Sequence, residues 1–141
     1  MIKAVKAGWV IDGSGGPAGK NMLMTLAGSE ISSLGHAAIP VQGDDDIVDF
    51  ADCTLLPGLI DAHVHLFMSG TYDPAIREGQ LQAGFDTVRG DIARRLKTSL
   101  EQGIVAVRDG GDRHGHALMY KTGHLDSQNM PVKVFTAGRA W

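Results

Sequence analysis

The chain of 141 residues has little cysteine, no long apolar run and no excess of positive charge. Its single cysteine, Cys53, cannot form an internal disulfide, so a reducing cytoplasm is the expected compartment. Because no run of about 18 uncharged apolar residues occurs, we expect neither a membrane span nor a signal peptide. The 13 basic residues are scattered among 16 acidic ones, without the basic stripe that nucleic acid selects. Nucleic acid and membranes are therefore not expected partners.

Glycine, by contrast, is abundant, with 19 residues in the chain against a usual share of about 7%. The glycines follow no fixed period, which indicates many tight turns rather than a repeat. The densest cluster, from Asp12 to Pro17, is expected to be a plain turn. A phosphate-binding loop would need a helix and a suitably placed lysine after it, and neither follows.

The first 56 residues predict short strands separated by turns, and hence a small all-β module. The β-compatible runs cover residues 2–11, 22–26, 31–35 and 47–56. Cys53 lies in the last run, far in sequence from any base, so a buried core thiol is expected rather than a nucleophile.

From Pro57 onward the pattern changes to alternating strands and helices, which is typical of parallel βα units. Strands are predicted over residues 59–66, 104–107 and 132–137, with a short helix over residues 116–122. A longer helix ends before Gly103, a residue suited to a helix C-terminus. Its apolar stripe indicates packing rather than cofactor binding and consists of Phe85, Val88, Ile92, Leu96 and Leu100.

The strand over residues 59–66 carries the chemistry. With a side-chain period of two, Asp61, His63 and His65 share one face of this strand. Two imidazoles so placed can bind one divalent ion, and Asp61 could orient one of them without itself binding the ion. Two polar residues at a strand exit are the plainer alternative.

These residues resemble the metal-dependent amidohydrolase superfamily, and within it the imidazolonepropionase-like or prolidase-like members. The resemblance rests on the segment from Leu56 to His65, on Gly103 to Asp109, and on the turn from Asp12 to Gly16. It implies an α/β fold in which residues 57–141 form about the first three βα units of an incomplete TIM-like barrel. Residues 1–56 would form a small, partial β-sandwich module before it.

The resemblance also implies a function. His63 and His65 would bind Zn²⁺ or another divalent metal ion, with Asp61 behind them, and metal-activated water would attack a C–N bond. The C–N bond would not be an ordinary peptide bond. Alternatively, it would be the bond of an Xaa-Pro-type dipeptide. Substrates would be small amides, amidines or dipeptides, and the parent enzyme could be a homo-oligomer. Because the family's other ligands come from later strands, this chain alone is expected to be an inactive N-terminal portion.

No residue is assigned as catalytic, but Arg108 and Asp109 end the second predicted barrel strand at the same rim as the histidine pair. They would contact substrate or anchor a loop, or else form an ion pair or turn cap. Arg113-His114-Gly115-His116 is expected to be a solvated loop or helix cap rather than a metal site. His36 and His124 fall in turn-like stretches.

Two other classes of protein stay open. One is another barrel metallohydrolase with a His-x-His strand, a phosphoesterase or TatD-like nuclease, although such proteins usually lack a leading β-module. The other is a non-catalytic structural protein that keeps the amidohydrolase fold.

Overall fold

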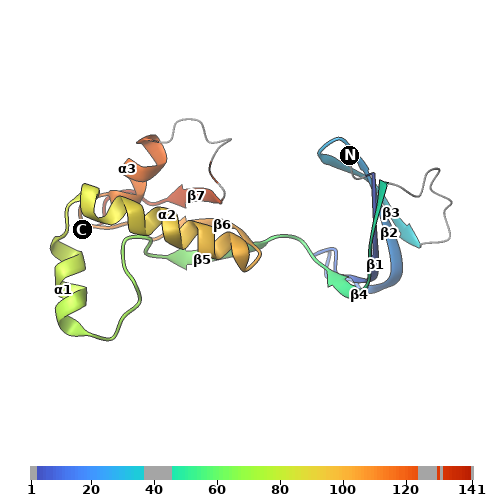
Figure 1. The fold of residues 1–141 in the computed structure, drawn as a ribbon, viewed down its shortest axis with the longest axis horizontal. Coiled ribbons are helices and arrows are strands. Elements are labelled where there is room, and N and C mark those ends of the chain that lie inside the picture. Colours follow the sequence, from blue (N-terminus) through green and yellow to red (C-terminus); the bar gives the residue numbers. More distant parts are fainter. Residues whose placement is uncertain (1–2, 37–45, 124–129, 131, 141) are drawn as a thin grey trace. The chain divides into compact units, whose positions relative to one another are not determined.

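The computed structural model describes residues 3–36, 46–123, 130 and 132–140. The fold is mixed α/β, and the chain divides between Pro57 and Gly58 into two compact units (Figure 1). Within the described residues, no helix is both long and apolar enough to cross a membrane.

The first unit holds one four-stranded sheet. Its strands are β1 (Ala4–Val10), β2 (Gly19–Ala27), β3 (Glu30–His36) and β4 (Ile47–Leu55). They lie in the order β3-β2-β1-β4, in which β1, β2 and β3 form an antiparallel meander and β4 pairs with β1 in parallel. The four β-strands predicted from the sequence are confirmed.

A glycine permits the close pairing of β1 with β4. The register of the two strands shifts between Ala7 and Trp9. A Cβ atom on the intervening Gly8 would lie only 2.0 Å from the carbonyl oxygen of Ala51, so no larger residue fits without moving a strand.

The predicted turn after β1 is confirmed. The Ser14 backbone N–H donates to the Asp12 carboxylate over 2.9 Å, and Gly13 and Gly15 both have positive φ angles. The prediction for Cys53 is wrong, because its side chain is exposed. The physical reason is that, among the described strands, β4 lies at the edge of the sheet beside β1, and most of its residues are exposed.

The second unit is built on a parallel sheet in the order β5-β6-β7. Its strands are β5 (Leu59–Val64), β6 (Ile104–Asp109) and β7 (Lys133–Thr136), which confirms the three predicted strands. β5 ends two residues earlier than predicted, because a turn begins there in which the Met68 N–H donates to the His65 carbonyl over 3.0 Å.

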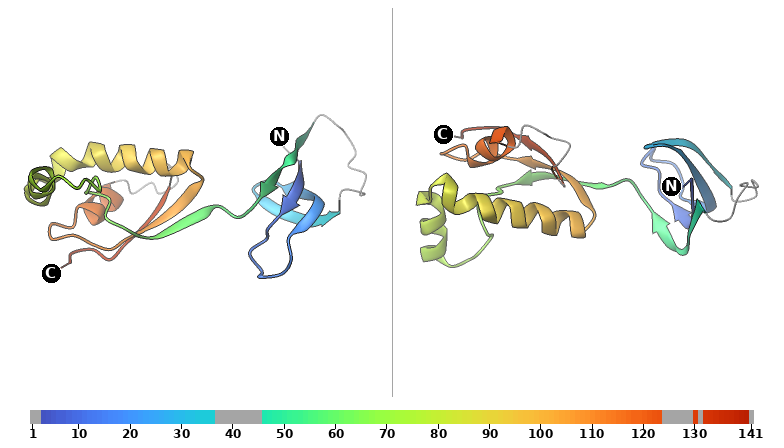
Figure 2. Two further views of the ribbon diagram at one scale, coloured as in Figure 1. Left: turned by 90° about the horizontal axis from the view of Figure 1, so that it is seen from below. Right: turned by 45° about the horizontal axis from the view of Figure 1, so that its top comes forward.

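Three helices accompany this sheet: α1 (Pro74–Gln82), α2 (Phe85–Glu101) and α3 (His116–Gly123). Figure 2 shows α2 lying along one face of the sheet. The helix α1 was not predicted from the sequence, because it has no buried residue and therefore no apolar stripe. Its signal is local instead, with Asp73 as N-cap and proline in the first turn.

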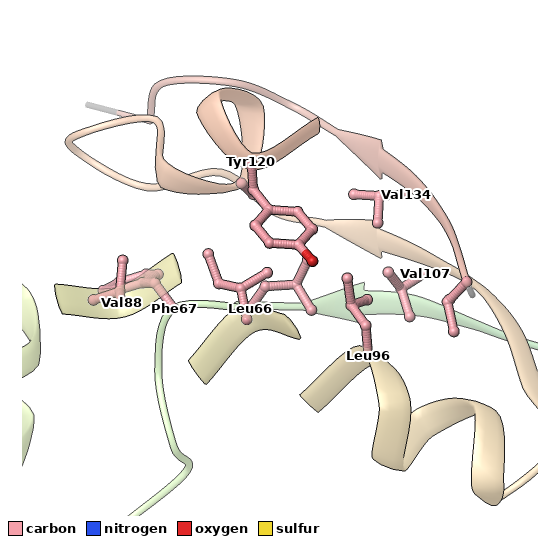
Figure 3. Close-up of a cluster of buried hydrophobic side chains, with 10 residues drawn as sticks. Leu66, Phe67, Val88, Leu96, Val107, Tyr120 and Val134 are labelled. Carbon is pink, nitrogen blue, oxygen red and sulfur yellow. The ribbon is translucent and has the colours of Figure 1, made fainter. Parts of the chain in front are cut away.

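The core of the second unit lies between α2, α3 and the sheet. In Figure 3, Leu96 points into the cluster from α2 and Tyr120 from α3, with Val107 and Val134 on the strands. Val88, Ile92 and Leu96 are buried, as the predicted stripe requires, whereas Leu100 is exposed. Burying each large side chain contributes about 1.5–3 kcal/mol.

Candidate functional site

Two histidines at the end of β5 converge at the carboxyl end of the sheet. His63 lies in β5 and His65 directly follows it, and their ring centroids are 5.4 Å apart with the planes inclined by 71°. A Cβ atom on Gly110, which follows β6, would lie 3.1 Å from His63 Nε2 and 3.1 Å from His65 Cε1. Both imidazoles therefore lie over Gly110, in space that a glycine leaves free.

One imidazole has a defined tautomer. The Nδ1 atom of His65 lies 3.0 Å from the carbonyl oxygen of Gly111. Because a carbonyl oxygen only accepts, Nδ1 must carry the hydrogen, which leaves a lone pair on Nε2. That nitrogen lies 3.5 Å from the Cβ position of Gly110. A histidine that donates from one nitrogen to a carbonyl is typical of metal ligands, which bind through the other nitrogen.

Asp61 contacts the backbone of the histidine pair. It lies in β5 and is half-buried, and its carboxylate accepts the backbone N–H of His63 over 3.1 Å. Among the described residues, no hydrogen bond joins Asp61 to either imidazole. Asp61 thus steadies the backbone of the strand at His63.

Asp109 is a buried carboxylate that joins two loops. Its side chain is inaccessible to solvent, with Oδ2 accepting the Leu66 N–H and Oδ1 the Gly111 N–H, each over 2.8 Å. The neighbouring Arg108 is exposed. Asp109 therefore ties the residue after His65 to Gly111 in the loop after β6, which is the loop-anchoring role among those expected for it.

The residues after Asp109 also have local reasons for their identity. Gly111 has a φ of +88°, and a Cβ atom there would lie 2.8 Å from the Gly138 carbonyl oxygen. The Asp112 carboxylate is buried and accepts the backbone N–H groups of His114 and His116 over 2.9 and 3.0 Å. It thereby caps the start of α3.

Of the two expectations for residues 113–116, a solvated loop or a helix cap, the solvated loop is wrong for His116 and the helix start is right. This residue begins α3 and is only 1% exposed, and its Nε2 donates to the Ala83 carbonyl over 3.1 Å. The cap formed by Asp112 turns the chain inward, which places the His116 ring against Phe67 and Phe85. The burial of this histidine was not visible in the sequence, because its partners lie far from it along the chain.

The two remaining histidines are not part of this arrangement. His36 is exposed and ends β3 rather than lying in a turn, and His124 falls outside the described residues. Among the described residues, no group of three or more histidine, cysteine, aspartate or glutamate side chains is arranged to hold a metal ion. His63 and His65 by themselves are two imidazoles, whereas a catalytic zinc site has three protein ligands.

A cavity of about 510 Å³ lies beside His65. Arg95 is part of its wall and donates to the Leu66 carbonyl oxygen over 2.6 Å. Burial lowers the pKa of the Arg95 guanidinium, while the nearby Asp91 carboxylate raises it. The other polar lining residues are Ser69, Thr71, Arg77 and Ser99. The cavity therefore offers positive charge and hydroxyl groups next to an imidazole.

No family model and no curated protein matches the chain. Solved structures do match it. A Xaa-Pro dipeptidase with bound methionine in the active site has a TM-score of 0.77 at 23% identity, over 97% of this chain and 33% of that one. Molinate hydrolase has a TM-score of 0.73 at 20% identity, over 96% and 29%. Ochratoxinase from A. niger has a TM-score of 0.72 at 21% identity, over 95% and 30%.

The chain thus spans about a third of the length of these solved proteins. By their names they are hydrolases, and another match is an amidohydrolase, with a TM-score of 0.70 at 20% identity. At such identities the likeness concerns the fold. The chain therefore shares the fold of about a third of these hydrolases, as the resemblance noted in the sequence leads us to expect.

Proposed function

We propose that the chain is the N-terminal portion of a metal-dependent amidohydrolase that hydrolyses C–N bonds. In this proposal residues 57–141 are about the first three βα units of a TIM-like barrel, and residues 1–56 are part of a β-sandwich module. The parallel order β5-β6-β7, with histidines at the carboxyl end of β5, supports the barrel assignment. The cytoplasm is the proposed compartment, on the basis of the single cysteine.

The observation that carries the proposal is the convergence of His63 and His65 over Gly110. The fit to a metal ion is chemical as well as spatial, because the hydrogen bond to Gly111 leaves the His65 Nε2 lone pair available. Imidazole nitrogens suit zinc and other divalent transition metals. The further ligands would come from the part of the enzyme that this chain does not span.

A zinc ion held there would lower the pKa of a bound water and polarise the substrate carbonyl. The residues of this chain would hold the ion and orient the groups around it. His63 and His65 would be the ligands, Asp61 steadies the His63 backbone, and the exposed Arg108 lies at the rim where substrate would enter.

The proposed substrates are small amides, amidines or dipeptides. The solved structures that share this fold support this class, since they include a Xaa-Pro dipeptidase, molinate hydrolase and phenylurea hydrolase B. Because the remaining ligands and the catalytic base would lie elsewhere, residues 1–141 alone are proposed to be inactive.

The test uses the intact protein, loaded with zinc and assayed on a panel of Xaa-Pro dipeptides, N-acyl amino acids and aryl ureas. His63→Ala combined with His65→Ala should abolish zinc binding, measured by calorimetry, and turnover. His36→Ala, which removes an exposed histidine from the other unit, should change neither. Full turnover in the double variant, or in thoroughly chelated protein, would contradict the proposal.

The same panel separates the alternatives. Turnover of phosphoesters but of no amide, lost in the double variant, would indicate a phosphoesterase-type barrel hydrolase. Zinc binding without any turnover would favour a structural role.

A further inference from the structure

We propose that Asp109 is a positioning residue that fixes the tautomer of His65 through the carbonyl group of Gly111. Nothing in the proposed chemistry requires Asp109 itself, which is buried and does not face the histidine pair as a ligand. The consequence for metal binding rests on the proposed function, whereas the tautomer itself does not.

The first step is the pair of hydrogen bonds that Asp109 accepts. One comes from the Leu66 N–H, next to His65, and the other from the Gly111 N–H, each over 2.8 Å. The two N–H groups bind different oxygens, Oδ2 and Oδ1, and among side chains of this length only a carboxylate has two acceptor oxygens. Charged acceptors also make stronger hydrogen bonds than neutral ones.

The second step is the closed circuit that these bonds complete. The Gly110 N–H donates to the Val64 carbonyl over 2.8 Å, and His65 Nδ1 donates to the Gly111 carbonyl over 3.0 Å. Residues 64–66 are thus joined to residues 109–111 by backbone and side-chain contacts on both sides of the imidazole. The bond to Asp109 holds the peptide unit before Gly111. The peptide unit after it carries the Gly111 carbonyl, and it is held through the Asp112 N–H, which donates to the Gly138 carbonyl over 3.3 Å. Together these bonds fix Gly111 on both sides, with its carbonyl toward His65.

The third step is the effect on the imidazole. A neutral imidazole in water carries its hydrogen mostly on Nε2, which would block that nitrogen as a ligand. The fixed Gly111 carbonyl requires the hydrogen on Nδ1 and so leaves Nε2 free before any metal ion arrives. Among the described residues, no hydrogen bond fixes the His63 ring in this way, so His63 is an internal reference.

The test is ¹⁵N NMR of histidine-labelled, metal-free intact protein near neutral pH. In the unmodified protein His65 should be in the Nδ1–H form. Asp109→Asn keeps one acceptor atom, so one of the two N–H groups loses its partner and His65 shifts against the Gly111 carbonyl. We expect His65 to revert largely to the Nε2–H form, with the His63 signals unchanged.

The second readout is metal affinity, measured by cobalt titration and followed by absorption. Removing a residue that supports a ligand typically weakens metal binding about 10–100-fold, and we expect a loss in that range for Asp109→Asn. Asp112→Asn is the matched control, because Asp112 is also buried but accepts the N–H groups at the start of α3. It should leave the His65 tautomer unchanged.

An Nε2–H form of His65 in the unmodified protein would overturn the proposal without any variant. An unchanged tautomer in folded Asp109→Asn would overturn it equally. If that variant does not fold, Asp109→Glu, which keeps both acceptors on a longer arm, should fold and retain the Nδ1–H form, and loss of that form would count against the proposal. A tautomer that responds as expected in a protein that binds no metal would support the role of Asp109 and contradict the proposed function.

Discussion

The guanidinium of Arg95 in α2 donates to the backbone carbonyl of Leu66 over 2.6 Å. The Asp109 carboxylate accepts the N–H of Leu66, so both backbone groups of Leu66 are held by side chains distant in sequence. Leu66 directly follows His65, and the turn after β5 is thereby attached to a helix and to a neighbouring strand. This turn has few conformations open to it while both side chains are in place.

Replacing Arg95 with methionine should destabilise the second unit. The buried carbonyl of Leu66 would lose its charged donor, which typically costs about 1.5–3 kcal/mol in the free energy of unfolding. Urea denaturation measures the change. Arg94→Met is the control, because Arg94 pairs with the same Asp91 but its side chain is 69% exposed. Equal losses in the two variants would show that the contact with Leu66 contributes nothing of its own.

Gly110→Ala should weaken metal binding without unfolding the protein. Its Cβ atom would lie 3.1 Å from atoms of both imidazoles, closer than nearly all such contacts, so the rings must move apart. We expect a loss of metal affinity of about tenfold, measured by calorimetry. Gly90→Ala in α2 meets no atom within 4 Å and should leave metal affinity unchanged. Unaltered affinity in Gly110→Ala would mean that the metal does not lie between the two rings.

Leu96→Ala should cost about 2–5 kcal/mol of unfolding free energy, because it opens a cavity in the cluster between α2 and the sheet. Leu100→Ala, one turn further along α2 at a 41% exposed position, should cost far less. Thermal or urea unfolding monitored by circular dichroism compares the two. Similar costs would indicate that the second unit lacks the core described above.

Asp73→Ala should loosen α1 and leave the rest of the unit intact. The Asp73 carboxylate accepts the N–H groups of Ala75 and Ile76 over 2.8 and 3.3 Å, and losing such a cap typically costs about 1 kcal/mol. Since α1 buries no residue, this loss should stay local. Hydrogen exchange should accelerate in residues 74–82 but not in α2. Faster exchange throughout α2 would show that the two helices unfold together.

Periodic patterns in the sequence predicted most of the secondary structure. The stripe in α2 was visible because Val88, Ile92 and Leu96 repeat every four residues and all become buried. The strands β5 and β6 were visible as apolar runs that start near glycine. By contrast, α1 has no buried face, and its only signals were Asp73 and Pro74.

The residues that depend on distant partners could not be predicted in the same way. Asp109 binds Leu66, 43 residues earlier, and His116 binds the Ala83 carbonyl, 33 residues earlier. Neither contact is marked in the sequence by a periodic pattern or by a short motif. The pair of glycines after Asp109 was the one local sign, because adjacent glycines at a strand end mark a place where the backbone approaches other groups closely.

The parallel pairing of β1 with β4 has a consequence for synthesis on the ribosome. The meander of β1, β2 and β3 needs only residues up to His36, whereas the other edge of β1 must wait for a partner that ends at Leu55. During this interval the nascent chain presents a strand with free N–H and C=O groups, which can pair with another nascent chain. Slowing translation when residues 1–36 have left the ribosome and Leu55 has not should therefore increase aggregation of newly made protein, whereas slowing it after Leu55 has left should not.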